Sequence, residues 1–226
     1  MFKNLSERHP WIPYVVPFVV FMAMLVIGPA LPVPLVAESV IRIGVLVTVI
    51  VLVARPVLTF RLTQPLGTVA VGVLVFVLWI GPDLLIPGYR DSILFQNDVT
   101  GKVASSMSVE ARADWLVVAL RFARAAIIVP IVEELFWRGW LPRWLERMDS
   151  FWTVPLGEFS RYTFWATAIL FALEHGPYWD VGLVAGLIYN WWMRRTKSLG
   201  DLIWCHAITN ACLSMWVVGM GDWRYW

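Results

Sequence analysis

The sequence predicts an all-α protein, a polytopic bundle of about seven to eight transmembrane helices around a polar cavity. Three observations predict this class. Of 226 residues, 59% are hydrophobic and only 15% are charged, and the mean hydropathy is positive, which is too apolar for a soluble domain. Apolar runs of about 20 residues, the length of a spanning helix, recur along the chain. The Lys and Arg residues of the short connections fall on one side of these runs.

Seven runs are long or apolar enough to be candidate spans. The first resembles a signal peptide, but no clear cleavage site follows it, so we expect a retained span. The fifth and sixth are short and separated by Gly176 and Pro177, which predicts either a tight antiparallel pair or one re-entrant unit. An interfacial helix or a partial eighth span is expected over 138–160. The seven candidates are 12–30, 35–54, 67–87, 115–137, 162–176, 178–193 and 199–219.

The basic residues predict the orientation of the bundle, because Lys and Arg in short loops favour the cytoplasmic side. We therefore expect an integral multi-pass membrane protein with a cytoplasmic N-terminus. The formal net charge of +2 is too small to indicate nucleic acid as a partner. No repeat, low-complexity tract or linker divides the chain, so residues 1–226 are expected to form one domain. The basic residues on the predicted cytoplasmic side are Lys3, Arg8, Arg55, Arg61, Arg138, Arg143, Arg147, Arg161, Arg194, Arg195 and Lys197.

The stretch "IVEELFWRGW" places two carboxylates and an arginine inside an apolar run. On a helix Glu134 and Arg138 are four residues apart and can pair along one face. Glu133 then lies on a neighbouring face without a partner on its own helix, which suits a general base. For Glu134 and Arg138 a purely structural ion pair is the alternative.

Two further polar pairs lie downstream at the same spacing. Phe171 and His175 are four residues apart in "FALEH", and His206 and Asn210 are four apart in "HAITN". A histidine supplies a donor and an acceptor, and an asparagine amide can stabilise a developing oxyanion. Glu174, beside His175, is expected to face another direction and to cap or wet the following turn.

The depths of these residues predict the length of the fourth helix. If that helix continues to about residue 147 with a kink at Pro142, Glu133 lies about 21 Å from its cytoplasmic end. At the same rise per residue, His175 lies about 21 Å and His206 about 18 Å from the cytoplasmic ends of their own helices. The three side chains then share a level, and we expect a cavity open to the cytoplasm.

The three motifs together resemble the CPBP family, which comprises type II CAAX prenyl endopeptidases and bacteriocin-processing or immunity proteins. The resemblance covers 115–218 as a protease-like core. It implies an intramembrane endopeptidase of a bacterial inner membrane that acts on a membrane-associated or hydrophobic peptide or protein. By that resemblance Glu133 and His175 activate water, His206 and Asn210 form the oxyanion site, and Glu134, Arg138 and Phe171 support them.

Metal dependence and a non-catalytic role are the two alternatives. Glu133, His175 and His206 could ligate a catalytic zinc ion, but the compact H-E-x-x-H spacing is absent, so metal-free activation of water is favoured. An immunity-type binding protein or a small transporter could keep the same fold. The intact motifs favour the enzyme, and no inverted repeat of the kind typical of transporters is present.

Overall fold

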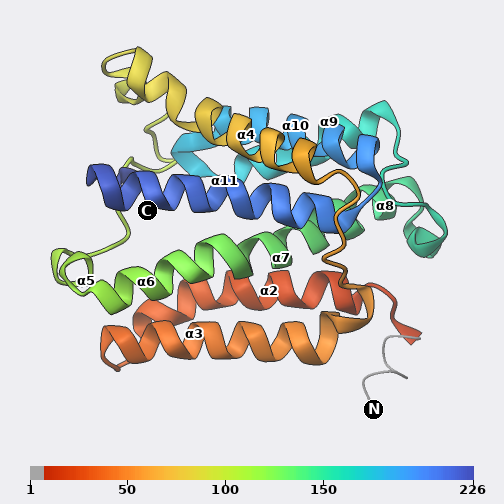
Figure 1. Cartoon of the computed structure of the whole chain (residues 1–226), viewed down its shortest axis with the longest axis horizontal. Helices are drawn as coiled ribbons and strands as arrows, with labels where there is room; N and C mark the ends of the chain where they lie inside the picture. Colours follow the sequence, from red (N-terminus) through yellow and green to blue (C-terminus); the bar gives the residue numbers. More distant parts are fainter. Residues whose placement is uncertain (1–7) are drawn as a thin grey trace.

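The computed structural model describes residues 8–226, and Lys3 lies outside them. The described chain is helical and has no strand, only an isolated bridge between Asn97 and Gly101, so the predicted all-α class is confirmed. Figure 1 shows the long helices side by side with nearly parallel axes. The helices are α2 (Ile12–Ile27), α3 (Leu35–Val49), α4 (Pro65–Leu85), α5 (Val109–Ala113), α6 (Trp115–Ala123), α7 (Val129–Glu134), α8 (Leu141–Glu146), α9 (Arg161–Leu173), α10 (Trp179–Thr196) and α11 (Leu199–Met220).

Five helical stretches within 8–226 are long and apolar enough to cross a membrane. They are Ile12–Ala30, Leu35–Val57, Pro65–Leu85, Trp115–Glu146 and Leu199–Met220. The predicted fifth and sixth spans form α9 and α10, a helix pair joined by the short turn Gly176–Tyr178. α10 packs on α4 as well as on α9, so this pair belongs to the bundle. No separate interfacial helix forms after α8, where the chain makes the short 3₁₀ segment Met148–Thr153.

The fourth membrane helix, Trp115–Glu146, has 32 residues, which confirms the predicted extension to about residue 147. Two wide π-helical turns, Arg124–Ile128 and Leu135–Trp140, separate α6, α7 and α8. Each turn ends two residues before a proline, Pro130 or Pro142. Proline cannot donate a backbone hydrogen bond and clashes with the preceding turn, and a wide turn relieves that conflict. The kink expected at Pro142 stays a prediction; the irregularity that the structure shows is the wide turn before it, and Pro130 follows a second wide turn.

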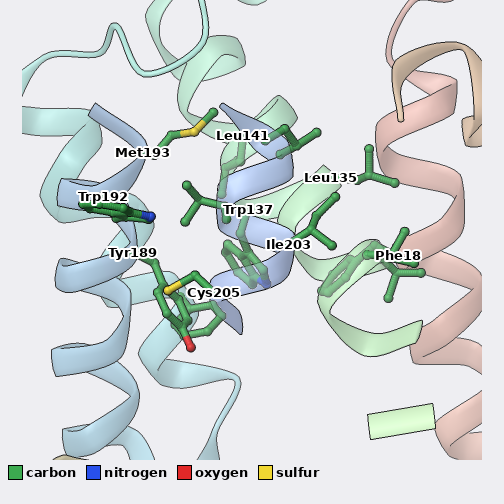
Figure 2. Packing of buried hydrophobic residues seen from close by; sticks show 14 of the residues in the cluster. Phe18, Leu135, Trp137, Leu141, Tyr189, Trp192, Met193, Ile203 and Cys205 are labelled. Atoms are coloured by element: carbon green, nitrogen blue, oxygen red, sulfur yellow. The ribbon is translucent and has the colours of Figure 1, made fainter. Parts of the chain in front are cut away.

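The packed core lies between α2, the fourth membrane helix, α10 and α11. Figure 2 shows Phe18, Trp137, Tyr189 and Ile203 pointing into this region from four elements. Phe18 of α2 also stacks on Phe136 with ring centroids 4.2 Å apart. Because lipid is as apolar as these side chains, close van der Waals packing rather than burial from water stabilises the contacts.

Asp201 ties the connection between α3 and α4 to the start of α11. Its carboxylate accepts hydrogen bonds from the Thr63 and Gln64 amides, at 2.8 and 2.9 Å, and from the Thr63 and Thr68 hydroxyls, at 2.9 and 2.8 Å. Its own amide donates to the N-cap Ser198. This carboxylate fixes where α11, which carries His206 and Asn210, begins.

Replacing Asp201 with Ala should destabilise the protein by about 3 kcal/mol, because four charge-assisted hydrogen bonds are lost and the buried hydroxyl of Thr68 loses its acceptor. The thermal unfolding midpoint of the detergent-purified protein measures this. Asp149→Ala, a matched change at an exposed carboxylate, should leave the midpoint unchanged. An equal midpoint for both variants would contradict the anchoring role.

Candidate active site

A cavity of about 190 Å³ lies inside the bundle, between the fourth membrane helix, α9, α10 and α11. Its lining includes Glu133, Phe171, His175, His206 and Asn210, so the structure brings residues of all three sequence motifs to one place. Glu133 is only 6% exposed. Within the described chain its carboxylate forms no hydrogen bond, which is costly inside a membrane.

Glu134 and Arg138 form the ion pair that the sequence predicts, beside the cavity rather than in its lining. The Arg138 Nη1 lies 3.0 Å from Glu134 Oε1, and both side chains are fully buried. Arg138 also donates to Asn190 Oδ1 at 3.3 Å, and its guanidinium lies 4.4 Å from the ring centroid of Phe171. The pair therefore connects the fourth membrane helix to α9 and α10.

His206 lies between the two glutamates. Its Nδ1 is 2.8 Å from Glu134 Oε1, and its Nε2 is 3.9 Å from Glu133 Oε2. Because an ionised carboxylate only accepts hydrogen bonds, Nδ1 carries a proton and Nε2 faces Glu133. Glu134 thus orients the ring of His206 toward the carboxylate of Glu133.

His175 is oriented in the same way by a backbone group. Its Nδ1 donates to the carbonyl oxygen of Phe171 at 2.7 Å, which leaves Nε2 as an acceptor. The ring packs between Phe171 and Trp79, at centroid distances of 4.6 and 5.2 Å. Gly182 of α10 makes room for it, since a Cβ there would lie 3.2 Å from the His175 Cβ. His175 is therefore held in one tautomer and one orientation.

Asn210 satisfies a carbonyl that the first wide turn leaves free. The amide of Val129 donates to Arg124 O, five residues back, so the corresponding donor for Ala125 O would be the nitrogen of Pro130. Proline has none, and Asn210 Nδ2 donates to Ala125 O at 3.0 Å instead. An amide nitrogen carries two hydrogens, so one stays available to a ligand in the cavity.

One polar residue of the site, Glu174, has a different contact from the one expected, and a second, Asn190, was not identified in the sequence. Glu174 does not cap the turn: its Oε2 accepts from Trp137 Nε1 at 3.0 Å, and it lies within electrostatic range of Glu133. Asn190 also donates to Phe164 O and Thr167 Oγ1, linking α10 to α9. The sequence signal that could have identified Asn190 is its position inside an otherwise apolar run, where a polar side chain needs a partner.

The direction of the cavity differs from the prediction. Beyond Glu133 and His206 its lining continues through Ala125, Ser214 and Trp226, toward the end of the bundle where α6 begins and α11 ends. This end also carries the 86–108 connection (Figure 1), not the arginine-rich end predicted to be cytoplasmic. Trp137, Tyr189 and the Arg138 network fill the bundle on the arginine-rich side, which is why the cavity does not open there. Which end faces the cytoplasm stays a prediction.

Glu133, His175 and His206 are the side chains of the site that could ligate a metal. No group of three or more His, Cys, Asp or Glu side chains within residues 8–226 has the geometry of a metal site. Glu133, His175 and His206 as arranged therefore do not fit a three-ligand zinc centre.

The comparisons with known proteins bear on the second half of the chain. Residues 115–212 match the family model of type II CAAX prenyl endopeptidase Rce1-like proteins. The match confirms the resemblance predicted from the three motifs, and it spans the helices that line the cavity. No curated protein and no solved structure matches the chain. This part of the chain is thus similar to a family of endopeptidases.

Replacing Arg138 with Ala should destabilise the protein by about 3 to 5 kcal/mol, because the buried Glu134 loses its cation. Arg138→Lys should recover part of this, since it keeps the charge but not the contact with Asn190. Thermal unfolding of the detergent-purified variants measures both. Arg195→Ala, at an exposed arginine, is the control; equal unfolding midpoints for Arg138→Ala and Arg195→Ala would contradict the role of the pair.

Proposed function

We propose that this protein is an intramembrane endopeptidase that hydrolyses a peptide bond of a membrane-associated or hydrophobic peptide or protein. The observation that carries the proposal is the Glu133 carboxylate, which lines the cavity, is buried without a hydrogen bond and faces Nε2 of His206. The family match over 115–212 supports the same reaction class. In this proposal a peptide segment of the substrate enters the cavity from the end of the bundle that carries the 86–108 connection.

In the proposed reaction Glu133 and His175 hold a water molecule between them. Glu133 takes a proton as the water oxygen attacks the carbonyl carbon of the peptide bond. The carbonyl oxygen becomes an oxyanion, and the free hydrogen of the Asn210 amide and the protonated form of His206 donate to it. Collapse of the intermediate breaks the C–N bond, and the proton passes to the leaving amine. The products are a carboxylate and an amine.

The supporting residues act on orientation in this proposal. Glu134 accepts from Nδ1 of His206, so that any proton on Nε2 points into the cavity. Arg138 neutralises Glu134, and Phe171 supplies both the backbone acceptor and one packing face for His175. Loss of any of these should weaken catalysis through a misplaced histidine.

Cells that carry Glu133→Gln should accumulate the full-length precursor of the substrate among their membrane or secreted proteins. The substitution keeps the shape of the side chain but removes the base. Quantitative proteomics against wild-type cells measures this and also identifies the substrate. His175→Ala and His206→Ala should give the same precursor, whereas Glu158→Gln, at an exposed carboxylate paired with Lys197, should not. If Glu133→Gln is produced normally and no precursor appears, a non-catalytic binding or transport role is favoured.

With the substrate identified, Asn210→Ala should lower kcat by about 10²–10³-fold, the usual effect of losing an oxyanion donor, and change KM little. The substitution also leaves Ala125 O without its donor, so thermal unfolding is measured in parallel. Asn97→Ala, in the 86–108 connection, is the control. A lower unfolding midpoint with an unchanged kcat would assign Asn210 to structure alone.

A further inference from the structure

A second cavity, of about 480 Å³, lies on the other side of the fourth membrane helix, between α2, α3, α6 and residues 106–108. Three of its lining residues are arginines, Arg42, Arg121 and Arg124, and one is acidic, Glu38. Three positive charges and one negative charge leave a net charge of +2. None of these residues takes part in the proposed reaction. We call this cavity the arginine pocket.

Two of the three arginines have no ion-pair partner within residues 8–226. Arg42 pairs with Glu38. Arg121 donates to the uncharged hydroxyl of Ser106 at 2.8 Å, and its guanidinium lies 5.4 Å from the ring centroid of Trp226. For Arg124 no hydrogen bond or ion pair forms with any side chain in residues 8–226. Two cations of the pocket thus lack an anionic partner.

All three arginines of the pocket lie within helices that are long and apolar enough to span the membrane. Arg42 is seven residues past the start of α3 and Arg124 is nine past the start of α6, which places their backbones about 10 and 14 Å along the helices. A charge at such depth is expensive unless it is paired or reaches the interface. Long arginine side chains can extend toward the headgroup level. An anion bound in the pocket near one surface of the bilayer would offset this cost.

The guanidinium of Arg42 is held in place before any ligand arrives. It packs against the backbone at Gly28, directly after α2, where a Cβ would collide with both Arg42 and Glu38. A side chain at residue 28 would therefore displace the Arg42 and Glu38 side chains from their present positions. A fixed guanidinium loses little entropy on binding.

The rim of the pocket carries exposed aliphatic side chains. Leu25, Val33 and Leu35 line it and are 43%, 38% and 46% exposed. Cationic groups beside exposed aliphatic side chains match a ligand that has both an anionic head and a hydrocarbon chain. A soluble anion has no hydrocarbon chain to contact these aliphatic side chains.

We propose that the arginine pocket binds the phosphate of an anionic membrane phospholipid, with the acyl chain on the apolar rim. Guanidinium groups bind phosphate oxygens through paired, charge-assisted hydrogen bonds, and basic pockets between transmembrane helices are suited to lipid headgroups. The phosphate supplies the counter-charge that Arg121 and Arg124 lack. The site borders the candidate active site, because Trp226 under Arg121 also lines that cavity.

The test uses the full chain purified in a neutral detergent and titrated with phosphatidylglycerol or with phosphatidylcholine of the same acyl chains. Native mass spectrometry measures bound lipid, and thermal unfolding gives an apparent affinity. We expect phosphatidylglycerol to be retained and to raise the unfolding midpoint, and phosphatidylcholine to do neither. Arg124→Gln should weaken the apparent affinity by about tenfold or more, the effect of losing a charge-assisted hydrogen bond.

Two further variants separate binding from folding. Arg124→Lys keeps the charge without the paired hydrogen bonds and should weaken the affinity less than Arg124→Gln does. Arg195→Gln, at an exposed arginine outside the pocket, should bind like wild type.

Three results would overturn the proposal. They are equal retention of the two lipids, an unchanged affinity in Arg124→Gln, and an equal loss in Arg195→Gln. Inorganic phosphate added alone is the remaining arm; if it raises the unfolding midpoint as much as phosphatidylglycerol does, the ligand is a soluble phosphate and not a lipid.

Discussion

The buried ion pair between Glu134 and Arg138 is the interaction on which the rest of the site depends. Neither side chain is exposed to solvent, and burying either charge alone in a membrane would be very costly. Their contacts extend to three other helices, through Asn190 of α10, Phe171 of α9 and His206 of α11. The position of each helix that lines the cavity is therefore coupled to one pair of charges.

This pair also explains why two adjacent glutamates have different surroundings. Successive residues of a helix point about 100° apart, so Glu134 can face the arginine only if Glu133 faces elsewhere. The Oε1 of Glu134 contacts two donors, from Arg138 and His206. Glu133 forms a hydrogen bond with neither, and its Oε2 lies 3.9 Å from Nε2 of His206. The helix geometry thus separates a structural carboxylate from one left free for chemistry.

The sequence was sufficient for features that depend on local spacing. The apolar runs located the five long helices, and the spacing of four residues between Glu134 and Arg138 predicted their pairing. The depth argument predicted that the fourth membrane helix continues past Trp137, and it reaches Glu146. The convergence of Glu133, His175, His206 and Asn210 on one cavity follows from the same argument, and their roles in catalysis stay predictions.

Features that depend on packing between distant segments could not be predicted. Trp137 and Glu174 are 37 residues apart, and Arg138 and Asn190 are 52 apart; neither contact has a periodic signature. The direction of the cavity depends on which side the large aromatic side chains fill, and a sequence pattern does not encode that. Glycines such as Gly28 and Gly182 acquire their roles only from the side chain that lies against them.

The prolines of the fourth membrane helix connect its irregular backbone to the chemistry. A regular helix would pair Ala125 O with a backbone amide and leave the amide of Asn210 without this acceptor. Because Pro130 has no N–H hydrogen, Ala125 O instead accepts a hydrogen bond from the side-chain amide of Asn210 and fixes the orientation of that amide. The second hydrogen of the amide then also points in a fixed direction. Arg124 precedes this carbonyl directly, so an anion held in the arginine pocket would restrain the same turn from its other side. The wide turn is thus the segment through which the two cavities would affect each other.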